Sequence, residues 1–152
     1  MEGSNLVSTP MVTGYKLSVN DESPNVNQTY YMSMVGNLLY VTATRPDIMQ
    51  AVGYVVRFQA FLKETHVQAV KRIFKYHKGT MSFGLWYPRC QYFTLTTYTS
   101  VDWGGSLDDR KRTSGGALFV GGCLVSWLNK KQASISLSTT KAEYIAVVSC
   151  CI

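Results

Sequence analysis

Basic side chains gather in three short clusters whose residue types suit contact with a polyanion. The first lies on a stretch with helical periodicity, the second in a charged loop, and the third in a lysine pair. They comprise Lys71, Arg72 and Lys75, then Arg110, Lys111 and Arg112, and finally Lys130 and Lys131. Lysine and arginine bind phosphate through their charge and their donated hydrogen bonds. Exposed charges are equally common on solvated turns, so the residue types alone leave both interpretations open.

The net charge of +6 is unevenly distributed along the chain. Residues 1–30 contain one basic and three acidic side chains, a balance of −2. Residues 31–152 contain the other 14 basic and 6 acidic side chains, a balance of +8. A basic body suits a nucleic-acid partner, although a soluble basic protein has the same composition. The sequence contains no P-loop, dinucleotide-binding, H-E-x-x-H or nucleophile-elbow motif, so these enzyme classes are not indicated.

The composition predicts a globular protein in the cell interior. Hydrophobic residues make up 46% of the chain and aromatic residues 12%, which argues against general disorder. No apolar stretch approaches the length of about 18 residues that a membrane-spanning helix needs. The first thirty residues contain no apolar segment behind a basic start, so no signal peptide is predicted. We therefore expect localisation in the cytoplasm or nucleus, without membrane association.

The order of periodic segments predicts an α+β chain in three parts. Residues 1–29 form an irregular lead, 30–80 a helical segment, and 81–152 a segment of strands followed by a helix. Helices are expected at about 30–44, 46–61 and 64–77, and His66 is expected to be exposed on the third. A last helix is expected within 136–152, where the end of the chain interrupts it. Strand-like runs lie at 84–87, 92–99, 116–120 and 123–127, with a Gly121-Gly122 turn between the last two.

Several of these segments carry motifs that resemble the Pol polyprotein of copia-type retrotransposons. In the helical part the motifs are R-P-D-I at 45–48, K-R-I-F-K-Y at 71–76, K-G-T at 78–80 and G-L-W-Y at 84–87. In the last part Y-T-S-V-D-W-G-G, D-R-K-R-T-S-G, S-W-L-N-K-K-Q and S-T-T-K-A-E-Y resemble the opening of the attached RNase H domain. The resemblance implies a helical connection segment at the end of the reverse transcriptase region. A truncated RNase H-like fold would follow it, with three antiparallel strands and then a helix.

The same resemblance implies a carboxylate site that is no longer intact. The intact family cleaves RNA in a hybrid with two Mg²⁺ ions, which require several converging carboxylates. Ser100 stands where the family has its first catalytic aspartate. Asp102 matches a second aspartate of that motif, on the same strand face as Ser100. Glu143 matches the catalytic glutamate of the helix, and the family's remaining ligands would follow residue 152. Asp102 and Glu143 are thus the remaining metal-ligand candidates, and no bound cofactor is expected.

Three functional hypotheses follow from these residues. The first is a degenerate Pol fragment without catalysis, which binds RNA–DNA hybrid or other nucleic acid weakly and without sequence preference. The second is a piece of a longer reading frame with RNA-directed DNA polymerase activity encoded upstream. The third is a recruited, effector-like interaction protein that binds a protein partner, or itself, through an exposed sheet edge and apolar surface.

Overall fold

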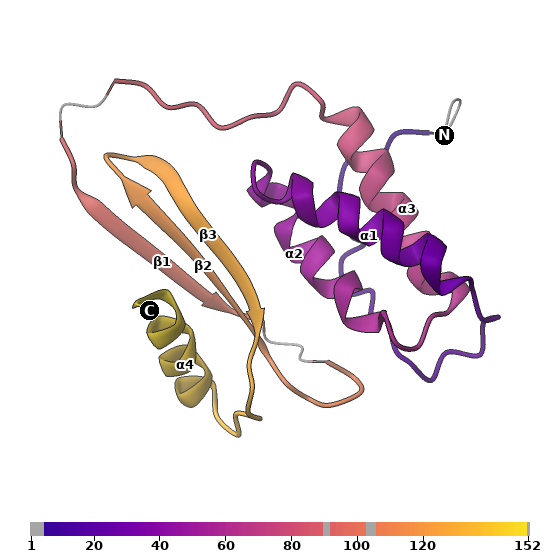
Figure 1. The fold of residues 1–152 in the computed structure, drawn as a ribbon. Coiled ribbons are helices and arrows are strands. Elements are labelled where there is room, and N and C mark those ends of the chain that lie inside the picture. The colour runs from indigo at the N-terminus through magenta and orange to yellow at the C-terminus, as the bar shows by residue number, and fades with distance from the viewer. Residues whose placement is uncertain (1–4, 90–91, 103–105, 152) are drawn as a thin grey trace. The chain divides into compact units, whose positions relative to one another are not determined.

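The computed structural model describes residues 5–89, 92–102 and 106–151, and the chain divides into two compact units (Figure 1). The first unit comprises residues 1–84 and is helical, and the second comprises residues 85–152 and contains the only sheet of the described residues. Helices are followed by three antiparallel strands and a last helix, so the α+β order predicted from the sequence is confirmed.

Three helices and a short 3-10 turn form the first unit. They are α1 (Gln28–Val41), α2 (Pro46–Val55), η1 (Val56–Phe58) and α3 (Glu64–Gly79). The side chain of Asn27 caps α1 by accepting a hydrogen bond from the backbone N–H of Tyr30 at 3.2 Å. Pro46 begins α2, where its missing N–H is no loss. The predicted helices therefore form, although α2 gives way to the 3-10 turn several residues before the expected end.

The core of the first unit lies between these helices and the segment that precedes them. Each helix buries one face, through Tyr31, Val35 and Leu38 of α1, Ile48, Ala51, Val52 and Val55 of α2, and Val67, Val70, Ile73 and Tyr76 of α3. The lead before α1 has almost no regular structure, yet its Leu17 is only 3% exposed and packs into this core. The lead thus contributes apolar burial to the helical unit.

The expectation that His66 is exposed is wrong. Its ring is completely buried and stacks on Phe58, with ring centroids 4.3 Å apart. Its Nδ1 accepts a hydrogen bond from the backbone N–H of Lys63 at 3.0 Å, at the start of α3. The imidazole therefore caps the helix end and fills a core position at once, a double role that sequence periodicity does not predict.

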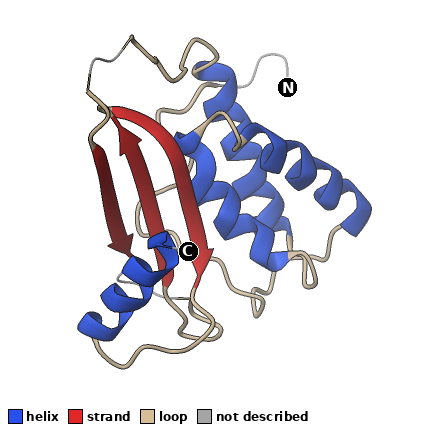
Figure 2. Ribbon diagram, turned by 60° about the vertical axis from the view of Figure 1, so that its left-hand side comes forward, coloured by secondary structure: helices blue, strands red, loops and turns tan. Residues whose placement is uncertain are grey.

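The second unit is a three-stranded sheet covered on one face by a helix (Figure 2). The strands β1 (Leu95–Val101), β2 (Thr113–Val120) and β3 (Cys123–Lys131) pair antiparallel in the order β1-β2-β3, and α4 spans Thr139–Cys151. Gly121 and Gly122 have φ of 57° and 81° and form the predicted turn between β2 and β3.

The helix approaches the sheet closely at Gly116. A Cβ atom at this position would collide with Sγ of Cys150 and lie 3.1 Å from Cγ of Leu128. Ala142 and Ala146 of α4 are fully buried. Small side chains on both elements thus allow the contact.

The strand-like run at 84–87 does not form a strand, which corrects the sequence-based prediction. Residues 83–89 have no regular structure, and Trp86 is 84% exposed. The hydroxyl of Tyr87 donates to the carbonyl oxygen of Leu124 at 2.7 Å. A strand requires a backbone partner, and no described segment pairs with this run.

No helix in the described ranges is long and apolar enough to cross a membrane.

Candidate functional site

The position that matches the family's first aspartate lies on the sheet face turned away from α4. Ser100 is exposed on β1 and pairs with Gly115 of β2. The residue before Gly115, Ser114, faces α4, because Nε2 of Gln132 donates both to its hydroxyl at 3.1 Å and to the carbonyl oxygen of Ala142 at 3.0 Å. Side chains alternate between the two faces of a strand, and paired residues share a face. Ser100 therefore projects from the opposite face.

The two remaining carboxylate candidates lie on different elements of the sheet unit. Asp102 follows β1, and its backbone N–H donates to the carbonyl oxygen of Thr113 at 2.9 Å. Glu143 is exposed on α4, beside the buried Ala142. Among the residues that the structure describes, no group of three or more histidine, cysteine or acidic side chains is placed to hold a metal ion. This donor set does not fit Mg²⁺, which takes several oxygen ligands in an octahedral arrangement.

Five predicted phosphate-binding residues come together at one end of the sheet. Arg110, Lys111 and Arg112 precede β2, and Lys130 and Lys131 end β3. The carbonyl oxygen of Arg112 accepts a hydrogen bond from the backbone N–H of Gln132 at 2.8 Å, which joins the two segments. We call these five residues the basic end of the sheet.

The turn before β2 fixes the backbone of this basic end. Arg110 has a φ of 55°, and its N–H donates to the carbonyl oxygen of Ser106 at 2.9 Å. Asp109 lies 2.5 Å from Nζ of Lys131 and also accepts from the N–H of Lys111 at 3.2 Å. Burial opposes ionisation of Asp109, but these hydrogen bonds outweigh it and lower its pKa. One of the five cations is therefore neutralised within the protein.

The three basic residues of α3 that were predicted to bind phosphate have different surroundings in the first unit. Nζ of Lys71 lies 3.9 Å from Oε1 of Glu64, an exposed ion pair of small energy. Nη2 of Arg72 donates to Oγ1 of Thr9 at 2.9 Å. Arg72 and Lys75 also line a cavity beneath the lead segment. Lys71, Arg72 and Lys75 therefore do not form a uniformly exposed basic surface.

The motifs of the helical unit meet at Arg45, which the sequence did not single out as a site. Its guanidinium donates to the two carboxylate oxygens of Asp47 at 2.9 and 2.7 Å. It also donates to the carbonyl oxygen and Oγ1 of Thr80 at 3.0 and 2.6 Å. The hydroxyl of Tyr76 donates to Asp47 at 3.0 Å. Residues of R-P-D-I, K-R-I-F-K-Y and K-G-T thus form one network that joins the start of α2 to the end of α3.

A second buried network joins three motifs of the sheet unit. Gln132 of the K-K-Q motif donates to Ser114 of T-S-G and to the backbone of α4, as described above. Its Oε1 accepts from the hydroxyl of Ser136 at 3.0 Å. Gln132, Ser114 and Ser136 are all buried. A buried amide needs its partners, so this network fixes α4 against the sheet. The only indication of this network in the sequence was the presence of polar residues in motifs that are otherwise rich in basic or hydroxyl side chains.

Known proteins that resemble this chain include transposon Pol polyproteins and a secreted effector. The chain is 38% identical over 141 residues to the retrovirus-related Pol polyprotein from transposon RE1 of Arabidopsis thaliana, covering 93% of this chain and 10% of that protein. It is 39% identical over 157 aligned positions to the corresponding polyprotein from transposon TNT 1-94 of Nicotiana tabacum, covering 96% and 11%. It is 39% identical over 118 residues to Secreted RxLR effector protein 161 of Plasmopara viticola, covering 77% and 83%.

The fold is α+β, and these relatives include Pol polyproteins of two plant transposons. The chain belongs to the family of copia-type retrotransposon Pol polyproteins. It spans about a tenth of the length of the Pol relatives that it matches. No family model and no solved structure matches it.

Proposed function

We propose that this chain is a catalytically inactive Pol-derived polypeptide that binds nucleic acid, including RNA–DNA hybrid, weakly and without sequence preference. The observation that carries the proposal is the basic end of the sheet. Residues 108–112 and 130–131 contain five basic and two acidic side chains, a surplus of three positive charges. Cations on neighbouring segments suit the closely spaced phosphates of a duplex, and phosphate contacts carry no sequence information.

The charge surplus sets the expected salt dependence. The ion pair between Asp109 and Lys131 removes one of the five cations from phosphate binding, and the charge of Asp108 offsets a second, which leaves about three contacts. For three phosphate contacts, affinity for a duplex falls about forty-fold between 50 and 200 mM salt. Binding of this kind is weak at physiological ionic strength and depends on few residues.

The absence of catalysis follows from Ser100. A neutral hydroxyl cannot balance the charge of a divalent cation as a carboxylate does, and the two-metal mechanism needs several carboxylates in one pocket. Glu143 alone cannot supply them. We therefore expect no Mg²⁺-dependent cleavage of the RNA strand by this chain.

A titration of the full chain against a fluorescently labelled RNA–DNA hybrid tests the proposal. Anisotropy is measured at 50 and 200 mM salt for the natural chain and for the double variant Lys111→Gln/Lys130→Gln. The double variant should bind at least tenfold more weakly at the lower salt, with a shallower salt slope. A control variant, Lys16→Gln/Lys78→Gln, removes the same charge from the helical unit and should change affinity little. Salt-insensitive affinity, or equal losses in both variants, would refute the binding proposal.

Cleavage is measured separately, so the two parts of the proposal are distinguishable. The same hybrid is incubated with the chain and Mg²⁺, and the RNA strand is resolved on a denaturing gel. Intact RNA is expected from the natural chain. Cleavage that disappears in Glu143→Gln would overturn the claim of inactivity and leave the binding result unaffected.

The similarity to the effector favours a second candidate function, an interaction protein. That relative is named a secreted effector, and the aligned region covers 83% of it. β1 lies at one edge of the described sheet, and its exposed Leu95 and Tyr98 follow the exposed Phe93. An unpaired edge beside apolar side chains favours self-association or a protein partner. Light scattering of the natural chain and of Tyr98→Lys tests it: a monomer in both would count against self-association.

The small share of the Pol relatives that aligns favours a third candidate, a piece of a longer reading frame with polymerase activity encoded upstream. Sequencing of the flanking locus and its transcripts tests this idea. A stop codon or frameshift directly before residue 1 would contradict it.

A further inference from the structure

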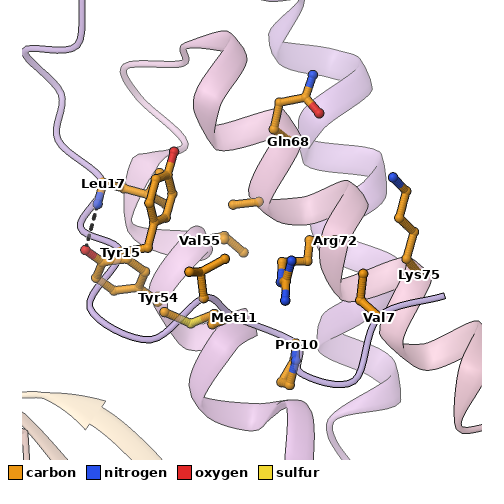
Figure 3. A pocket seen from close by; sticks show the side chains of 12 residues that line it. Val7, Pro10, Met11, Tyr15, Leu17, Tyr54, Val55, Gln68, Arg72 and Lys75 are labelled. Carbon is orange, nitrogen blue, oxygen red and sulfur yellow. Dashed lines mark hydrogen bonds between the residues drawn. The ribbon is translucent and has the colours of Figure 1, made fainter. Parts of the chain in front are cut away.

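A cavity of about 270 Å³ lies in the helical unit, under the lead segment and against α2 and α3 (Figure 3). Its walls are mainly apolar, from Met11 and Leu17 of the lead, Tyr54 and Val55 of α2, and Ala69 of α3. The backbone N–H of Leu17 donates to the hydroxyl of Tyr54 at 3.0 Å, which holds the lead against α2. This hydrogen bond thus links two walls of the cavity that lie 37 residues apart in the sequence.

Two cations from successive turns of α3 line the same cavity. Arg72 extends from the helix toward Pro10 of the lead, and Lys75 follows one turn later (Figure 3). Nη2 of Arg72 donates to Thr9, whereas its buried Nε has no hydrogen-bond partner within the described structure. An oxyanion in the cavity would accept hydrogen bonds from the guanidinium of Arg72 and balance the charges of Arg72 and Lys75.

We propose that this cavity binds a small amphipathic organic anion, composed of one or two rings or a short chain and a carboxylate. The size of the cavity supports this class. A cavity of about 150 Å³ is enough for benzene, and pockets for drug-sized ligands begin near 300 Å³. The apolar part of the ligand lies against Met11 and Val55. Its carboxylate accepts hydrogen bonds from the guanidinium of Arg72, and Lys75 on the next turn adds positive charge. This site is distinct from the basic end of the sheet and does not depend on nucleic-acid binding.

Calorimetric titration of the full chain with 1-naphthoate and 1-naphthamide tests the proposal. The two probes have nearly the same shape, but only the carboxylate carries a charge. The carboxylate should bind at least about tenfold more tightly, because hydrogen bonds to a charged acceptor are the stronger kind. Arg72→Gln should remove most of this preference, whereas Lys130→Gln, which deletes a cation from the sheet unit, should leave it unchanged. Equal affinity for both probes would overturn the proposal.

A second variant distinguishes a loss of ligand binding from a structural effect of the arginine substitution. Ala69→Leu keeps both cations and the helix propensity of α3, but its larger side chain occupies the cavity. It should weaken binding of both probes at least about tenfold while the helical circular dichroism stays unchanged. Undiminished binding in this variant would place the ligand elsewhere and refute the proposed site. Failure of the natural chain to bind 1-naphthoate saturably below about 5 mM would refute it as well.

Discussion

Arg45 joins α2 to the end of α3, and its replacement by methionine should destabilise the helical unit by about 3 kcal/mol. The side chain of Arg45 is 6% exposed, and it donates to Asp47 and Thr80 through four hydrogen bonds of 2.6–3.0 Å. Removal of one partner from a buried ion pair costs about 3–5 kcal/mol. The side chain of Asp47 is 31% exposed, so water partly replaces the lost partner and the lower end applies.

The distribution of aromatic residues allows the two units to be followed separately. The tryptophans Trp86, Trp103 and Trp127 all lie in residues 85–152, so tryptophan fluorescence reports on the sheet unit. α1, α2 and α3 lie in residues 1–84, so far-ultraviolet circular dichroism is dominated by the helical unit. Urea unfolding of Arg45→Met should lower the circular dichroism midpoint and leave the fluorescence midpoint unchanged.

Two comparisons make this prediction refutable. Arg89→Met makes the same chemical change at an exposed site in the sheet unit and should leave the circular dichroism midpoint unchanged. In the double variant Arg45→Met/Asp47→Asn, the losses should fall short of additivity by about 1–2 kcal/mol, because both substitutions remove the same contact. A loss below about 1 kcal/mol in Arg45→Met, or strict additivity, would show that the network does not stabilise the unit.

Three further predictions address acid stability and the packing of α4. The hydrogen bond from Arg45, opposed by partial burial, lowers the pKa of Asp47 below its ordinary value of 3.8. The ionised carboxylate therefore stabilises the folded helical unit fully above pH 3.8. This stabilisation is lost as the pH falls through the lower folded pKa. Urea midpoints between about pH 5 and 2 should therefore fall in the natural chain, and Asp47→Asn should lack this component of the decline. Gly116→Ala should destabilise the sheet unit by about 1–3 kcal/mol in fluorescence-monitored unfolding, because its Cβ would collide with Cys150 and crowd Leu128. In Gly115→Ala the new atom meets only the carbonyl oxygen of Ser100 at 3.9 Å, so a loss as large as that of Gly116→Ala would contradict the packing argument. Gln132→Leu should cost about 1–3 kcal/mol in the same assay, because buried groups of Ser114, Ser136 and Ala142 lose their partner. An unchanged fluorescence midpoint in Gln132→Leu would contradict this.

Several elements could be predicted from the sequence because their determinants are local. Pro46 begins α2, and the spacing of apolar residues places a helix after residue 63. The glycine pair at 121–122 supplies the positive φ angles of the β2–β3 turn. Ser100 and Glu143 were identified by the resemblance to the family, and their functional roles stay predictions.

Only the tertiary structure decided which polar groups are buried and what they contact. His66 is a core residue because Phe58 provides a stacking surface. Arg45 is buried because Thr80, thirty-five residues later, completes its hydrogen bonds. Gln132 joins segments eighteen and ten residues away in the sequence. A side chain's type and its neighbours in sequence set its propensity for helix, strand or turn. The free energy of burying a polar group depends on partners that the fold brings from distant positions, so it is fixed only when the chain has folded.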